Sequence, residues 1–95
     1  MSDFQISRDG DTLSIAGVLD FTTAREVLEA VAPAIRETAS LTVDLGAVSS
    51  CNSAALALMI EWLGLARRNK HIVRFQSVPD GLRQLAVVCQ VDSLI

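Results

Sequence analysis

The side chains suited to nucleophilic or acid–base chemistry are few in this sequence. Cys51 and Ser53 are candidate nucleophiles, and His71 is the only histidine that could serve either one as a base. Nucleophilic catalysis requires a base within hydrogen-bond reach, and a lone histidine in a predicted turn is usually solvated. The motifs of serine hydrolases, zinc proteases and nucleotide-binding loops do not occur. We therefore expect a protein that is not an enzyme and has no catalytic residue.

Asn52 and Ser53 stand where a predicted loop passes into a predicted helix, and two interpretations fit them. Either side chain can accept a hydrogen bond from a free N–H group at the start of the helix, which is the common role of Asn and Ser there. A helix N-terminus also stabilises added negative charge, so the Ser53 hydroxyl is a physically sensible phosphate acceptor. Residue types and spacing alone favour the cap.

The two cysteines predict neither a disulfide nor a metal site. Cys51 and Cys89 lie far apart and belong to no CxxC or Cys/His pattern. A domain with a good apolar core does not need a disulfide to hold it together. We expect two reduced, non-catalytic thiols in a cytoplasmic protein that holds no metal and no cofactor.

Charge and hydropathy narrow the classes of partner. The net charge is −3, and the one basic group, Arg67, Arg68 and Lys70, falls at a predicted helix end, where cations complement the helix dipole. Nucleic acid is therefore not an expected ligand. The first residues lack the pattern of a secretory signal, and the apolar run from Ala54 to Ile60 is far shorter than the ~20 residues of a membrane span. We expect no membrane span.

The order of predicted elements, β-β-α-β-α-β-α, indicates a single α/β domain over residues 1–95. Residues 3–20 alternate around a turn at Asp9-Gly10-Asp11 and predict a β-hairpin. Helical spacing follows over 22–38, where Pro33 predicts a kink or an early break. A strand at 41–45, a loop at 46–50, a helix at 53–69, a strand at 72–76 and a helix at 80–89 follow. We expect a mixed sheet of about four strands, with the helices mainly on one face.

The predicted helix at 53–69 has more apolar residues than one buried side needs. At ~100° per residue they form two stripes on opposite sides. The first consists of Leu56, Met59, Ile60 and Leu63, and the second of Ala54, Leu58, Trp62 and Leu65. Either other elements of the domain cover both sides, or the second stripe is an interface centred on Trp62, a residue type enriched in binding hot spots. We favour the interface, which also leaves open a homodimer of the isolated chain. The residues predicted to bind a partner are Asn52, Ser53, Ala54, Leu58, Trp62 and Leu65.

The run from Leu41 to Leu58, LTVDLGAVSSCNSAALAL, resembles the signature stretch of STAS domains, the family of anti-sigma factor antagonists and sulfate transporter tails. The family pattern is roughly apolar-x-Val/Ile-Asp-Leu-x-x-Val, followed by Asp-Ser/Thr-small-Gly-Leu. The predicted order of elements agrees with this family over nearly the entire chain. The resemblance implies the STAS, or SpoIIAA-like, fold.

Within that family the sequence is most similar to the MlaB (Ttg-type) branch, which sits on the ATPase of the Mla phospholipid ABC transporter. The similarity lies in GDTL at 10–13 with GVLD at 17–20, in LALM at 56–59 continuing to LARR at 65–68, and in termination soon after the third predicted helix. It implies a cytoplasmic subunit, peripheral to the inner membrane through its partner. Such a subunit would bind an MlaF-like ATPase and support its assembly and activity in maintaining outer-membrane lipid asymmetry.

The same resemblance implies an alternative, a regulator similar to anti-sigma factor antagonists that is switched by phosphorylation. The phosphoacceptor of that group would correspond to Ser53, and the acidic residue before it to Asn52. The sequence departs from the pattern here, because the carboxylate is lost and Ala54-Ala55 replace the small residue and the glycine. Both changes argue against regulated phosphorylation.

Overall fold

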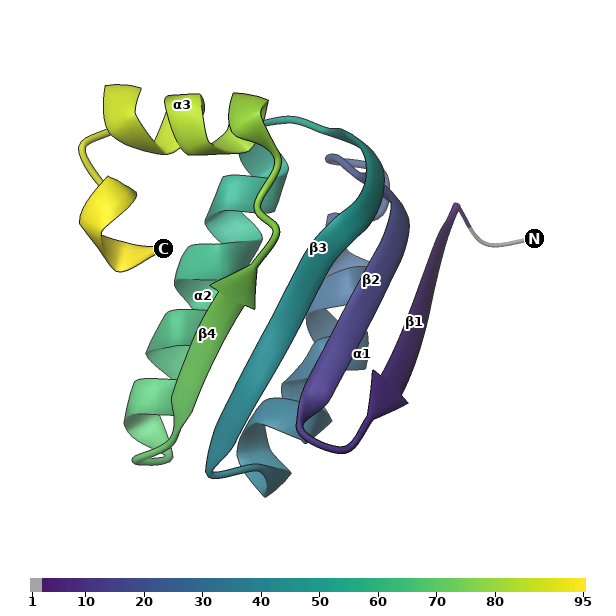
Figure 1. Cartoon of the computed structure of the whole chain (residues 1–95), viewed down its shortest axis with the longest axis vertical. Helices are drawn as coiled ribbons and strands as arrows, with labels where there is room; N and C mark the ends of the chain where they lie inside the picture. Colours follow the sequence, from purple (N-terminus) through teal and green to yellow (C-terminus); the bar gives the residue numbers. More distant parts are fainter. Residues whose placement is uncertain (1–2) are drawn as a thin grey trace.

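The structure is a computed structural model that describes residues 3–95 (Figure 1). Four strands and three helices alternate after an initial hairpin, and a short 3-10 turn ends the chain. The strands are β1 (Phe4–Asp9), β2 (Thr12–Leu19), β3 (Ser40–Cys51) and β4 (Ile72–Gln76). The helices are α1 (Ala24–Glu37), α2 (Ser53–Arg68) and α3 (Asp80–Val88), and the 3-10 turn is η1 (Asp92–Leu94).

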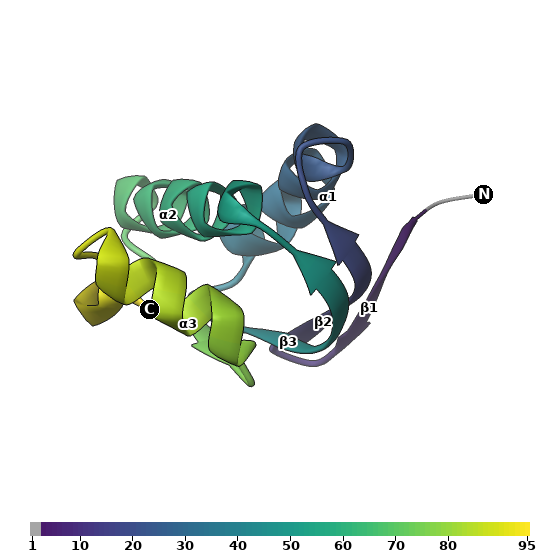
Figure 2. The same cartoon turned by 90° about the horizontal axis from the view of Figure 1, so that it is seen from above.

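The strands form one mixed sheet in the order β1-β2-β3-β4. The pair β1–β2 is antiparallel, whereas β2–β3 and β3–β4 are parallel and are connected through α1 and α2. Figures 1 and 2 show α1 and α2 side by side over one face of the sheet. Helix α3 lies near the carboxyl end of β3 and the amino end of α2 (Figure 1). The predicted α/β class, with a four-stranded mixed sheet, is confirmed.

The predicted hairpin is present, and its turn is set by one glycine. Asp9 pairs with Thr12, so only Gly10 and Asp11 lie between β1 and β2. Gly10 has φ +61°, a left-handed conformation that glycine adopts without a steric penalty and that two-residue hairpin turns require.

The core lies between the sheet and the helices, because alternate strand residues point to the same face. The strands supply Leu13, Ile15, Leu41, Val43, Leu45 and Val73, all of them buried. From α1 come Val27, Val31 and Ile35, which recur on one side of the helix. The predicted break at Pro33 does not occur, since α1 continues past this exposed residue to Glu37.

Strand β3 is longer than the sequence predicted, because the expected loop at 46–50 is part of the strand. Residues 47–51 pair only with β2, since the pairing with β4 ends where Asp44 meets Gln76. A strand segment with one neighbour and one open edge shows no regular alternation of buried and exposed residues, so the sequence carried no strand signal there. This extension carries Cys51 and the start of α2 beyond the end of β4.

Candidate partner-binding surface

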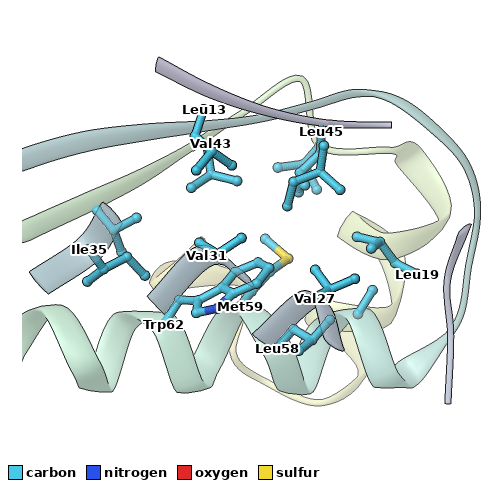
Figure 3. Packing of buried hydrophobic residues seen from close by; sticks show 14 of the residues in the cluster. Leu13, Leu19, Val27, Val31, Ile35, Val43, Leu45, Leu58, Met59 and Trp62 are labelled. Carbon is cyan, nitrogen blue, oxygen red and sulfur yellow. The ribbon is translucent and has the colours of Figure 1, made fainter. Parts of the chain in front are cut away.

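Trp62, the predicted anchor of the interface, is a core residue, and the prediction is wrong on this point. Its side chain is 0% exposed, and Figure 3 shows it among Val31, Ile35 and Met59 beneath the sheet. The ring centroid of Phe75 lies 6.4 Å from that of Trp62. The indole Nε1 has no hydrogen-bond partner within the described part of the chain.

The error has a geometric cause. The centre of the buried side of α2 is formed by Ala55, Met59, Trp62 and Ala66, a series at helical spacing that lies about a quarter of a turn from each predicted stripe. Ile60, assigned to the core, is 38% exposed, whereas Leu58, assigned to the interface, is 4% exposed. The other interpretation of the sequence is therefore correct: elements of the domain cover α2 on more than one side, since α2 packs against α1, α3 and β4.

The amino end of α2 is exposed and is capped by Asn52. The Asn52 Oδ1 atom accepts a hydrogen bond from the backbone N–H of Ala54 at 2.8 Å, as an N-cap side chain does. Ser53 is the first residue of the helix and is exposed. The predicted position of Ser53 is confirmed, and the capping role belongs to Asn52. The Ser53 hydroxyl therefore stands at the helix N-terminus without serving as its cap.

The remaining reactive side chains do not assemble around Ser53. Cys51 is half-buried, Cys89 is exposed, and both are free thiols. His71 follows the carboxyl end of α2, where its Nδ1 atom lies 2.9 Å from the carbonyl oxygen of Ile35. The 16 residues of α2 separate His71 from Ser53, which corresponds to about 24 Å along the helix axis. His71 is thus out of reach as a base for Ser53 or Cys51.

A shallow apolar groove runs between α1 and α2, next to the amino end of α2. Its volume is about 300 Å³, at the lower end of the range for binding pockets. It is lined by Phe21, Ala24, Arg25, Leu28, Ala54, Ala57, Leu58 and Glu61. Two of the predicted partner-binding residues, Ala54 and Leu58, thus line this groove, although each is mostly covered by its neighbours. Leu65 is half-buried and lies outside the groove.

Phe21, which the sequence analysis missed, is the most exposed aromatic side chain in the described part of the chain, at 74%. It lies in the turn between β2 and α1, which hydrogen bonds of Thr22 and Thr23 stabilise. The Thr22 backbone N–H donates to Asp20 Oδ1 at 2.8 Å, and the Thr23 hydroxyl donates to the carbonyl oxygen of Val18 at 2.8 Å. One feature of the sequence could have indicated it: Phe21 is an aromatic residue among polar turn residues, outside the alternating pattern of the strand that precedes it.

Two charged residues line the groove, Arg25 on α1 and Glu61 on α2. Arg25 is paired with Glu29 at 3.5 Å on the exposed side of α1. Glu61, on the opposite wall, has no ion-pair partner among residues 3–95. Hydrogen bonds from the Thr22 hydroxyl and backbone N–H hold the pKa of Asp20 below its ordinary value of 3.8, so this carboxylate beside Phe21 is ionised at neutral pH. Of the two charged residues that line the groove, Arg25 and Glu61, only Glu61 has no ion-pair partner in the described part of the chain.

Within residues 3–95, no three side chains of the metal-binding types lie close enough to hold an ion. The same described residues form no helix with the length and apolar character to cross a membrane. What the geometry provides is an exposed hydroxyl, an exposed aromatic ring on a hydrogen-bonded turn and an apolar groove, all at one end of the α1–α2 layer.

Solved structures of anti-sigma factor antagonists share this fold. SpoIIAA in its unphosphorylated form superposes with a TM-score of 0.73 at 14% identity, over 95% of this chain and 83% of that one. An anti-sigma factor antagonist from Mycobacterium paratuberculosis gives 0.73 at 17% identity, over 97% of this chain and 80% of that one. The predicted SpoIIAA-like fold is confirmed.

A comparison with curated proteins found no match. Among protein families, the model described as "Mlab, STAS domain" matches residues 2–95. STAS domains and this antagonist fold are generally non-enzymatic. The match spans nearly the whole sequence and agrees with the fold and with the signature stretch that ends in α2, and so the chain belongs to the STAS domain family, in its MlaB type.

Proposed function

We propose that this protein is a cytoplasmic accessory subunit of an ABC-type phospholipid transporter of the Mla kind. It binds the MlaF-like ATPase subunit, supports the assembly and activity of that ATPase, and reaches the inner membrane only through this complex. The observation that carries the proposal is the family match over residues 2–95. In this role the protein catalyses no reaction and acts through a surface that binds the ATPase.

The proposed surface is the exposed amino end of α2 together with the adjoining groove. Asn52 and Ser53 are exposed at this end, and Ala54 is the first residue of the groove wall. Trp62 is excluded as a direct contact because its side chain is fully buried. Interfaces gain affinity from a few central contacts rather than from total area, and a ring held clear of the core at Phe21 is suited to that role.

The test is to express the chain together with the MlaF-like ATPase of the same organism and to measure copurification and ATP hydrolysis. We expect a stable complex whose hydrolysis rate falls when the chain is absent. Failure of the purified proteins to associate would contradict the proposal.

Substitutions at Ser53 test the location of the contact. Ser53→Ala should leave affinity nearly unchanged, because Asn52 provides the cap. Ser53→Glu adds bulk and charge at the contact, and we expect a loss of roughly tenfold or more in affinity. Ser40→Glu is the matched control, because Ser40 is an exposed serine at the opposite end of β3. Equal binding by all variants would remove Ser53 from the interface.

The second candidate function is a regulator that is switched by phosphorylation at Ser53. The observation in its favour is the exposed hydroxyl at a helix N-terminus, where the helix dipole stabilises a phosphate. Asn52 in place of an acidic residue argues against it. Recovery of a serine kinase as the cellular partner, with one phosphate added in wild type and none in Ser53→Ala by intact mass, would establish this function instead.

A further inference from the structure

The groove between α1 and α2 has a lining that folding alone does not require. Phe21 exposes most of its ring to water, and Ala57 is exposed in the opposite wall. An exposed apolar surface beside a preformed groove is typical of binding sites. The wall formed by Ala54, Leu58 and Glu61 spans seven residue steps of α2, about 10 Å, or two helical turns.

We propose that this groove receives an apolar segment of the ATPase subunit that carries a basic residue opposite Glu61. The inference rests on the proposed function and specifies the partner chemistry of the same surface. The apolar side chains of the segment pack against Phe21 and the alanine-lined wall. Its cation compensates the carboxylate of Glu61, which has no ion-pair partner among the described residues.

The charge of the groove favours this occupant over two others. A second copy of the chain would bring another unpaired Glu61 carboxylate to the groove, while its Arg25 is already paired with Glu29, and like charges placed together at an interface cost affinity. The chain as a whole carries a net charge of −3, which further opposes self-association. An anionic phospholipid surface would be repelled for the same reason. A basic protein segment meets complementary charge.

The experiment titrates the purified chain with the purified MlaF-like ATPase and compares single variants. Phe21→Ser should weaken binding by roughly 30-fold or more, as removal of a hot-spot side chain does. The melting temperature should not change, because the ring is 74% exposed. Wild-type affinity with intact folding in Phe21→Ser would overturn the proposal.

Charge variants test the basic residue separately from the apolar contact. Glu61→Gln should weaken binding by a few-fold and reduce its dependence on salt, and Glu61→Lys should weaken it by roughly tenfold or more. Glu37→Lys is the matched control, because Glu37 is exposed at the other end of α1 and makes the same change in net charge. Equal losses in Glu61→Lys and Glu37→Lys would show a general charge effect and overturn the assignment of Glu61.

The outcomes separate this inference from the proposed function. No binding by the wild-type chain would overturn both. Wild-type binding that all groove variants retain would overturn the inference alone. Light scattering of the chain alone and sedimentation with vesicles of phosphatidylethanolamine and phosphatidylglycerol test the other two occupants. A dimer, or vesicle binding, that is lost in Phe21→Ser would assign the groove to that occupant instead.

Discussion

The core around Trp62 and the groove beside Phe21 lie on different sides of α2, and they differ in solvent exposure. On the sheet side of α2, Trp62 is 0% exposed and is surrounded by residues of α1 and α2; on the groove side, Phe21 is 74% exposed and is held by a turn. Folding accounts for the first aromatic residue, because the core needs its volume. Nothing in the fold requires the second. Exposure, rather than residue type, is therefore what makes Phe21, and not Trp62, the candidate binding residue of this domain.

The comparison predicts its largest effect at Trp62. Trp62→Ala leaves a cavity beneath the sheet, and we expect a loss of about 3–5 kcal/mol in the free energy of unfolding, enough to unfold many domains of this size. Phe21→Ala should change the same free energy by less than about 0.5 kcal/mol. Urea denaturation of both variants measures the difference. Similar losses at the two positions would show that the two regions are not distinct in the way proposed.

A smaller effect separates the cap from the candidate contact at the amino end of α2. Asn52→Ala removes the acceptor for the Ala54 backbone N–H and should cost about 1 kcal/mol of stability. Ser53→Ala should cost less than about 0.5 kcal/mol. Thermal melting of both variants checks the order. A larger loss at Ser53 would mean that its hydroxyl, and not the Asn52 side chain, stabilises the start of the helix.

The smallest effect is at the turn that holds Phe21, and it depends on pH. Hydrogen bonds from Thr22 lower the pKa of Asp20 below 3.8. A carboxylate whose pKa is depressed in the folded state stabilises the fold above its unfolded value, and that contribution is lost as the pH falls through the folded value. The melting temperature of wild type should therefore exceed that of Asp20→Asn slightly at pH 7, and the gap should close below pH 3.8. A gap that persists in acid would point to a cause other than the charge.

Much of the fold was predictable because local signals and tertiary structure agree. The hairpin has its glycine at the turn, and the predicted helix at 53–69 matches α2 at Ser53–Arg68 within one residue. The extension of β3 was not predictable, because a strand with one neighbour lacks the alternation on which strand prediction depends.

The candidate site was only partly predictable for a different reason. Ser53 was placed correctly because capping chemistry is local. The orientation of α2 depends on which elements pack against it. Neither predicted stripe contains Ala55 or Ala66, which complete the buried series with Met59 and Trp62. Phe21 was not predicted as a candidate contact because the observation that singles it out is the exposure of its side chain. Exposure at a single turn position cannot be derived from the sequence.

The buried indole has a spectroscopic consequence. The chain has one tryptophan and no tyrosine, so emission excited in the near ultraviolet comes from a single side chain in a dry, apolar environment whose Nε1 has no hydrogen-bond partner among residues 3–95. We expect emission at short wavelength in the folded protein and a clear red shift on unfolding. Because this fluorophore lies beneath the sheet, a segment that docks in the groove should leave its emission wavelength unchanged. Fluorescence thus reports the integrity of the domain while a separate label on the partner reports binding.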